Sequence, residues 1–527
     1  MLKITSTKRT LLLTAVIIWG FQAHSQIIDK DFGDDGMTTT VFTPEGASVA
    51  RAIGVQGNDK LVAVGYDNGQ MGGAFAASRY LADGTLDTSF GTNGKVVLNV
   101  GGLLSDAYEV AFDNSGNIFI AGIAEVDATA GGGLVDVLVK MTPAGVLDNT
   151  FGTNGVVMTK FGSEIQSLST SVLVQDNGKI ILGGSVNTGS SSGSASDFAV
   201  ARINSDGSID ESFGDAGFKI VDMGAYDTLF KLAFTSDEKI VAVGYAIADY
   251  KLDTESSDAV LTQINTDGSI DESFGSSGIA TLDLNAFSYA YNVAVQNNNK
   301  IVITGETKDN GTLSDFFTAR YNTDGTLDNT FNDTGIVQTN FLTEENIEES
   351  YSVSIQQNER IVVAGAAGSE GTRFIAIARL MPNGKYDDSF GEAGKYLYET
   401  DATRSINILG GELLAENKLV LAGRSQVNGK RAFFLSQFSL DETLSVEDDN
   451  LVSMSVYPNP TRDVINFQSA IDMTTSFVSV YDASGRIIKN EALTNSRKLD
   501  ISDLASGAYL VQVSNGKQVF TKKIMKR

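Results

Sequence analysis

A short box, Asp-x-x-Phe-Gly, recurs seven times along this chain at intervals of about 60 residues. Its aspartates are Asp29, Asp87, Asp148, Asp210, Asp271, Asp328 and Asp387. Only the sixth copy departs from the pattern, because Asn332 replaces its glycine. A fixed period of this length constrains the chain to a repeat fold, in which each unit packs against its neighbours.

Each unit also contains a β-rich run that ends in Gly, such as residues 60–65 and 239–244, preceded by another strand and a polar turn. A third strand follows a variable loop, and a fourth follows the box. Four antiparallel strands per unit predict an all-β, seven-bladed β-propeller over residues 26–440. We take the strand after the box as the innermost strand, which gives these blades: 37–80, 95–141, 156–203, 218–264, 279–321, 336–380 and 395–439.

The two ends of the repeat array complement each other. The box at Asp29 has no third strand before it, and the last third strand, residues 433–438, is followed only by a degraded box at residues 440–444. We therefore expect the N-terminal box to dock on the seventh blade. This contact would close the ring and remove open sheet edges.

The boxed aspartates are predicted to hold turns rather than to bind a ligand. An Asp just before a turn Ser or Thr accepts backbone N–H bonds, and seven equivalent copies favour this structural role. The boxed Phe is expected to pack between blades. A basic residue recurs in the third strand and can pair with the boxed carboxylate of its own unit. In five units this residue is Arg79, Lys140, Arg202, Arg320 and Arg379.

The full motif around the box is Asn204-x-Asp206-Gly207 followed by Asp210-x-Ser212-Phe213-Gly214, and it recurs from Asn265 to Gly275. It resembles the motif of the delta-60 repeat proteins, which are bacterial propeller-like repeat proteins. The resemblance covers roughly residues 27–440. It implies the propeller fold and no known reaction.

The first 25 residues are predicted to be a secretory signal. Lys3, Lys8 and Arg9 precede an apolar run over residues 11–21, and cleavage is expected between Ser25 and Gln26. That run is shorter than the roughly 20 residues that span a bilayer, so we expect no transmembrane segment in the mature chain.

Cleavage would remove the chain's single His and single Trp, and the chain has no Cys. A mature chain without these residues excludes Ser-His-Asp and Cys-His catalysis, thiolate or imidazole metal sites, and disulfides. We nominate no catalytic, cofactor-binding or metal-binding residue from the sequence.

The chain is acidic, with 39 basic and 65 acidic residues. Nucleic acid is excluded as a partner, because phosphate binding requires clustered Lys and Arg. The acidity favours solubility outside the cell. The alternative is attraction of divalent cations, since cations such as Ca²⁺ take oxygen ligands.

A different pattern begins after an acidic linker at residues 441–452. Residues 453–527 are predicted to form a small β-sandwich, and their marked positions are Tyr457, Pro458, Asn459, Pro460, Gly485, Gly507 and Tyr509. These motifs resemble the type A C-terminal sorting domain of the type IX secretion system of Bacteroidetes-type bacteria. The resemblance implies export to the periplasm and passage across the outer membrane by the type IX machinery. Removal of the domain, with release or surface attachment, would follow. The alternative is an ordinary β-sandwich binding module.

Variation among the units is concentrated in the loop after the Gly-ending strand and in the loop after the post-box strand. Alternate connections of an up-and-down blade emerge on one face, so both loop sets share a face. We therefore predict a monomeric, non-catalytic surface protein that binds a glycan or protein there. The alternative is a carboxylate-dependent polysaccharide hydrolase or lyase, for which two acids suffice; the acids are spread through all blades, so no pair is nominated.

Overall fold

The computed structural model describes these residues: 27–57, 59–69, 72–102, 104–126, 133–161, 167–187, 196–224, 226–247, 257–284, 286–308, 313–342, 346–369, 372–399, 405–440, 455–468, 476–482, 486–493, 497–514 and 519–527. Residues 1–444 form one compact unit and residues 445–527 another. The predicted cleavage site at Ser25 and Gln26 and the linker at residues 441–452 lie outside the described residues.

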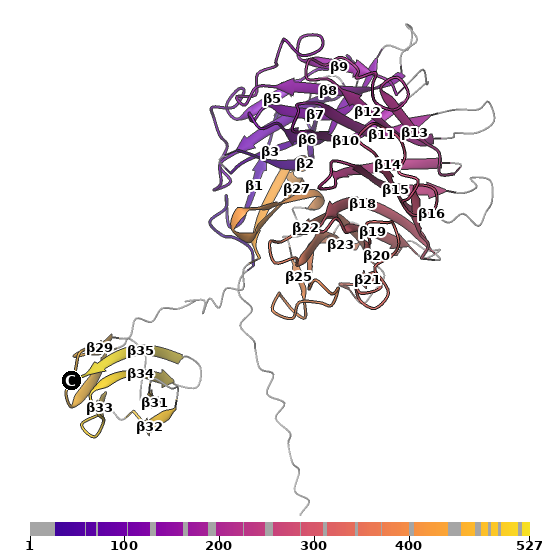
Figure 1. Ribbon diagram of the computed structural model, residues 1–527. Helices are drawn as coiled ribbons and strands as arrows, with labels where there is room; N and C mark the ends of the chain where they lie inside the picture. Colours follow the sequence, from indigo (N-terminus) through magenta and orange to yellow (C-terminus); the bar gives the residue numbers. More distant parts are fainter. Residues whose placement is uncertain are drawn as a thin grey trace, which may run out of the picture. The chain divides into compact units, whose positions relative to one another are not determined.

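Unit 1 is an all-β ring of seven four-stranded antiparallel sheets in its described residues (Figure 1). A single parallel bridge between Ser314 and Ile347 links two neighbouring sheets. In each blade the first strand contacts the first strands of both neighbouring blades, and the seventh contacts the first, so these strands surround the axis.

The strands fall into four sets by their position in the blade. The first, innermost strands are β2 (Ser48–Gln56), β6 (Leu104–Phe112), β10 (Ser167–Val174), β14 (Tyr226–Phe234), β18 (Phe287–Val295), β22 (Ile347–Ile355) and β26 (Asn407–Leu414). The second strands are β3 (Lys60–Asp67), β7 (Ile118–Val126), β11 (Ile180–Asn187), β15 (Ile240–Ile247), β19 (Ile301–Lys308), β23 (Ile361–Ser369) and β27 (Lys418–Val427). The third strands are β4 (Ala74–Tyr80), β8 (Gly133–Met141), β12 (Ser196–Ile203), β16 (Ser257–Ile264), β20 (Ser314–Tyr321), β24 (Thr372–Leu380) and β28 (Lys430–Ser439). The outermost strands are β5 (Lys95–Leu98), β9 (Val156–Thr159), β13 (Phe218–Val221), β17 (Ile279–Leu282), β21 (Ile336–Thr339), β25 (Lys395–Tyr398) and β1 (Met37–Thr40). A single turn of 3₁₀ helix, η2 (Ala415–Asn417), precedes β27.

The expected strand order was wrong at one position. The strand after the box pairs back with the third strand of its own unit, as β5 does with β4, and is therefore outermost rather than innermost. The box is a compact connection in which Arg79 N–H donates to Gly94 O, so the chain turns straight back along the third strand. Each blade range consequently starts one strand later than expected.

The ring closes through the N-terminus, as expected from the two ends of the array. Strand β1 pairs with β28, so the indigo start and the orange end of unit 1 meet in Figure 1. Asp29 takes the place of the missing seventh box, since its N–H donates to Gln437 O at 2.8 Å and its carboxylate pairs with Lys418 at 2.9 Å. Gly33 N–H then donates to Asp83 O of blade 1 at 2.7 Å.

The core lies between the blades. One apolar cluster, for example, combines Val64 and Phe75 of blade 1 with Ile118 and Ile120 of blade 2. The second strands are buried on both faces, as their continuous apolar runs predict. Burial of this kind contributes about 25 cal/mol per Å² of apolar surface.

Unit 2 contains two antiparallel sheets. Their orders are β29 (Ser455–Tyr457), β30 (Val464–Gln468), β33 (Lys498–Asp500), and β32 (Ile487–Ala492), β31 (Phe477–Tyr481), β34 (Gly507–Ser514), β35 (Val519–Lys526). A separate core that includes Ile465, Val480, Val511 and Ile524 lies between them. This arrangement matches the small β-sandwich that the alternating strands predict.

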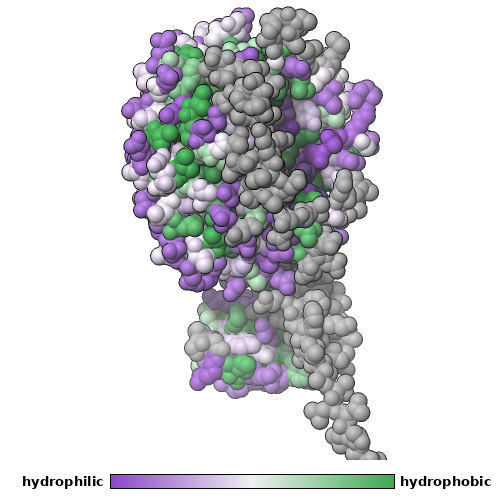
Figure 2. Space-filling model, turned by 90° about the vertical axis from the view of Figure 1, so that its right-hand side faces the viewer, coloured by the Kyte–Doolittle hydropathy of each residue, from purple (hydrophilic) through white to green (hydrophobic). Residues whose placement is uncertain are grey.

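In the view of Figure 2, hydrophobic surface residues form small patches among hydrophilic ones. Exposed apolar residues of unit 1 include Val146 and Met158. Scattered apolar residues are normal on a protein surface. Within the described residues, no helix has the length and apolar character needed to span a membrane.

Candidate functional site

Each boxed aspartate holds its own turn and also pairs with cations. In the fourth box, Oδ1 of Asp210 accepts the Ser212 N–H at 3.2 Å and the Ser212 hydroxyl at 2.6 Å. Oδ2 accepts Lys179 Nζ at 2.7 Å and Arg202 Nε at 2.6 Å. The same turn contacts occur at Asp87, Asp328 and Asp387.

These contacts lower the pKa of the boxed carboxyls. Burial acts to raise the pKa of Asp210, but hydrogen bonds from Lys179, Ser212 and Arg202 outweigh it and hold the pKa well below its usual range. The pKa is lowered in all seven boxes. The boxed aspartates therefore carry their negative charge at neutral pH.

The box also fastens each blade to the next one. Gly214 N–H donates to Asp267 O of the following blade at 2.8 Å, and Arg202 Nη1 donates to Thr266 O at 2.5 Å. The buried ring of Phe213 packs against Gly268 of that turn, as expected for a residue between blades. The repeated residues thus form interblade contacts.

Most of the marked positions of unit 2 lie at strand ends: Tyr457 ends β29, and Pro458, Asn459 and Pro460 follow it. The Tyr457–Pro458 and Asn459–Pro460 peptide bonds are cis, and Asn459 exchanges hydrogen bonds with Lys523 O and Met525 N–H of β35. Gly507 opens β34, and the Tyr509 hydroxyl donates to Ala505 O at 2.8 Å. Gly485 lies outside the described residues.

The variable positions of the ring converge on the axis. Every innermost strand has a β-bulge, and the bulged residues are Arg51, Tyr108, Thr170, Phe230, Tyr291, Tyr351 and Leu409. All seven line one axial cavity of about 390 Å³. A β-bulge re-aims a side chain, so the bulges turn seven different residues toward one space.

The repeated Gly of the second strand accompanies the bulge. Gly244 pairs with Leu229, the residue before the bulged Phe230. A Cβ on Gly244 would lie 1.8 Å from Thr228 O, and on Gly65 1.9 Å from Val49 O. Only glycine permits this close approach of the two backbones.

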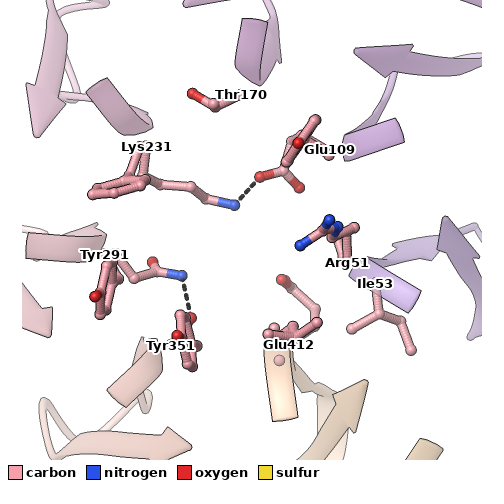
Figure 3. A pocket seen from close by; sticks show the side chains of 15 residues that line it. Arg51, Ile53, Glu109, Thr170, Lys231, Tyr291, Tyr351 and Glu412 are labelled. Carbon is pink, nitrogen blue, oxygen red and sulfur yellow. Dashed lines mark hydrogen bonds and ion pairs between the residues drawn. The ribbon is translucent and has the colours of Figure 1, made fainter. Parts of the chain in front are cut away.

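Four charged side chains line the cavity: Arg51 is itself a bulged residue, Glu109 and Lys231 directly follow bulged residues, and Glu412 lies further along β26. Lys231 and Glu109 point toward each other and form an ion pair, while Glu412 and Arg51 extend toward the same space (Figure 3). The surrounding protein raises the pKa of Glu412 to about 7, Lys231 opposes this shift, and Glu109 adds to it. Glu412 nevertheless contacts solvent in the channel.

Aromatic rings form a belt on blades 4 to 6. Tyr291 stacks on Tyr351 at 4.8 Å between ring centroids, and Phe230 meets the edge of Tyr291 at 5.0 Å. The Tyr291 hydroxyl donates to buried Glu306 at 2.6 Å. Burial and the charge of Glu306 raise the pKa of Tyr291, so its phenol stays protonated.

Sequence reasoning did not find this cavity. It placed the binding site among variable loops, and the largest of these, at residues 127–132, 188–195 and 248–256, lie outside the described residues. The sequence does contain one indication of the site. One position in each repeat, which is Arg51 in blade 1 and Leu409 in blade 7, differs from blade to blade although the strands around it are similar. A bulge reverses the inward and outward alternation, so the pattern alone does not show that this position faces the axis.

The fold and the axial site define a β-propeller repeat protein with a separate C-terminal domain. Five stretches match the family described as a domain of unknown function (DUF5122) beta-propeller, at residues 56–90, 175–213, 235–274, 296–331 and 356–390. Residues 455–527 match the secretion system C-terminal sorting domain. The chain therefore contains DUF5122 propeller repeats and a type IX sorting domain, and the sorting domain indicates a protein secreted to or attached at the cell surface.

No curated protein matches the chain. Among solved structures, the extracellular domain of the hybrid two component system BT4673 from B. thetaiotaomicron is similar, with 10% identity and a TM-score of 0.37 over 96% of this chain. The chain spans 59% of the length of that domain. The polysaccharide lyase Uly1 is 12% identical with a TM-score of 0.41, covering 77% of this chain and 92% of the lyase. The α-L-arabinofuranosidase Arb93A from Fusarium graminearum is 10% identical with a TM-score of 0.37, covering 79% of this chain and 97% of that enzyme.

Proposed function

We propose that this surface propeller binds a carbohydrate in its axial cavity without catalysis. The observation that carries the proposal is the set of seven bulges, which bring different side chains of an otherwise repetitive ring into one space. Four of the seven bulged residues are aromatic: Tyr108, Phe230, Tyr291 and Tyr351. Aromatic faces suit the apolar faces of sugar rings, and charged or amide groups such as Lys231 and Asn292 suit hydroxyls.

A glycan array probed with residues 26–527 tests this proposal. Tyr351→Ala is expected to weaken binding of any glycan found by at least tenfold, because it removes one ring of the belt. Tyr351→Phe keeps the ring and should retain most of the affinity. Met158→Ala, on outer strand β9, is the control away from the axis. Glycan binding that Tyr351→Ala leaves unchanged contradicts the axial site.

One observation favours the alternative, a polysaccharide-cleaving enzyme. Glu109 and Glu412 are two acids in the axial cavity, and their surroundings differ: Glu109 pairs with Lys231, whereas the pKa of Glu412 is raised to about 7. Two carboxyls in different electrostatic surroundings are the pattern of the acid and base of glycosidases.

Catalysis would be detected as the formation of a cleavage product from a polysaccharide. If the protein cleaves a polysaccharide, a new reducing end or unsaturated product appears, and Glu412→Gln abolishes its formation while glycan binding persists. With Glu412 as the general acid, the rate should fall as the pH rises through about 7, because the carboxyl then loses its proton. Binding without any product supports the non-catalytic function.

A further inference from the structure

Three aspartates meet where blade 3 joins blade 4, on the face of the variable loops. Asp197 is near the start of β12, Asp222 follows β13, and Asp227 is the second residue of β14. One carboxylate oxygen from each lies within 4.8 Å of the others. Phe198 pairs with Val221, so Asp197 and Asp222 are neighbours across the same two strands.

Asp227 is completely buried, and half of its carboxylate is unsatisfied. Oδ2 accepts the Met223 N–H at 2.6 Å. Oδ1 is buried and accepts no hydrogen bond in the part of the chain that the structure describes. The Gly224 N–H donates to Asp222 at 3.1 Å. A buried carboxylate oxygen without a partner is costly, and two further carboxylates beside it add repulsion.

The repeat supplies internal comparisons for Asp227. In each blade one residue of the first strand pairs with the repeated Gly, and Asp227 lies two residues before that residue in blade 4. Four other blades have a Ser at this position: Ser48, Ser105, Ser167 and Ser288. At the next junction the matching set is Asp258, Asp283 and Ser288, which contains two acids. The third acid of the blade 3–4 junction is therefore a departure from the repeat, and turn geometry does not require it.

The following junction shows how the fold otherwise satisfies such acids. There Asp315 accepts the Asn340 amide at 3.0 Å, and Glu348, at the position of Asp227, accepts the N–H groups of Phe341 and Leu342. Each acid thus has a protein donor. At Asp227 the buried Oδ1 accepts no hydrogen bond from the described residues, and two other carboxylates lie close to this side chain.

We propose that Asp197, Asp222 and Asp227 bind a hard divalent cation, with Ca²⁺ as the best match. Carboxylate oxygens are the preferred ligands of Ca²⁺, and its bonds of about 2.3–2.6 Å allow three oxygens within 4.8 Å of one another to share one ion. Mg²⁺ usually keeps several waters and is bound by only one or two carboxylates. The cation would tie β12, the interblade connection and β14 together.

The electrostatics agree with this assignment. Burial and the charges of Asp197 and Asp222 raise the pKa of Asp227 to about 7, although the N–H groups of Met223 and Gly224 act to lower it. A bound cation would offset the repulsion among the three carboxylates, and the buried Oδ1 of Asp227 would gain a partner by coordinating it.

Calcium titration of residues 26–527, freed of metal with a chelator and held at pH 8, tests the proposal. Isothermal calorimetry with CaCl₂ is expected to show one site, and Tb³⁺ emission excited through tyrosine should rise and then fall when Ca²⁺ competes. Asp227→Ser should weaken the affinity for Ca²⁺ at least tenfold and remove the Ca²⁺-dependent rise in melting temperature. Its fold is expected to hold, because Ser occupies this position in four sibling blades.

Two further variants keep the result interpretable. Asp258→Asn, at the next junction, should leave calcium binding unchanged. Asp222→Asn changes an exposed side chain and replaces Asp227→Ser if that variant does not fold. A wild-type protein that shows neither heat nor Tb³⁺ emission overturns the proposal. Calcium affinity that survives both site variants also overturns it.

Discussion

At the residue scale, the boxed aspartate uses its two oxygens for two different tasks. Oδ1 closes the local turn, and Oδ2 receives cations from the second and third strands. The recurrence of the box and of the third-strand Arg predicted the turn and the Arg pair. The recurrent Lys at the start of the second strand was missed, because a partner about 30 residues away is visible only when both strands are placed in one sheet.

Blade 3 and blade 4 provide a matched test of the ion pair. Asp210→Ala leaves buried Arg202 without its carboxylate and should lower the free energy of unfolding by about 3 kcal/mol or more. Asp271→Ala should cost less, about 1–2 kcal/mol, because Gln263 replaces the Arg there, so the only cation that loses its carboxylate is Lys239, whose side chain is 29% exposed. Urea unfolding of both variants gives the comparison. Equal losses would contradict the role assigned to Arg202.

The aspartate and glutamate side chains of the propeller lead us to expect that its free energy of unfolding is largest at mildly acidic pH. The boxed carboxyls have lowered pKa values, so their contribution is complete above about pH 4 and is lost as the pH falls below that. Burial raises the pKa of Asp136 to about 7, and of Glu348 likewise. These two favour the folded state in their protonated form, so stability declines as the pH rises from about 4 to 7.

Urea midpoints measured from pH 3 to pH 8 should therefore peak near pH 4. Asp136→Asn is always neutral and should reduce the decline between pH 5 and pH 8. A midpoint that rises steadily to pH 8 would contradict the raised pKa values.

At the element scale, the strands were predicted from apolar runs, but their grouping was shifted by one strand. The post-box strand has four residues, as in β5, and lies between two loops in sequence. Sequence spacing does not show which neighbour it joins. The structure assigns it to the preceding strand because the hydrogen bonds of the box fold the chain back along that strand, whereas the link to the next blade, although shorter, varies in length from blade to blade.

The Gly opposite each bulge gives the prediction at this scale. Gly244→Ala places a Cβ against the Thr228 carbonyl, so the strands must separate, at a cost of about 1–3 kcal/mol. The shift should also displace Phe230 and weaken any axial ligand. Gly57→Ala, where a Cβ meets no atom within 4 Å, is the control for urea unfolding. Equal midpoints for the two variants would mean that the bulge tolerates a side chain.

At the scale of the whole molecule, the two units have separate cores and separate tasks. The propeller closes with residues up to Leu440, and Arg379 donates to the Leu440 carbonyl. We therefore expect deletion of residues 453–527 to leave a folded propeller that stays in the periplasm, because the sorting domain is lost. Cell fractionation and limited proteolysis check both parts. Normal export of the shortened chain would contradict the sorting role.

The ring itself depends on its N-terminus, which supplies what the seventh repeat lacks. Deletion of residues 26–36 removes Asp29, leaving Gln437 and Lys418 without their carboxylate, and removes the Gly33 bond to blade 1. It also removes the buried Phe32, which packs between the last blade and the first. We expect a melting temperature lower by several degrees and a greater tendency to aggregate, since the joint between blades 7 and 1 opens and exposes sheet edges.

Asp29→Ala alone should give a smaller decrease in the same direction. The other six boxes are continuous in sequence with the third strand of their own blade. Asp148→Ala is therefore the matched comparison, because it removes only the ion pair with Lys140 and the hydrogen bonds of the turn. If the deletion melts like the intact protein, the N-terminal segment does not close the ring.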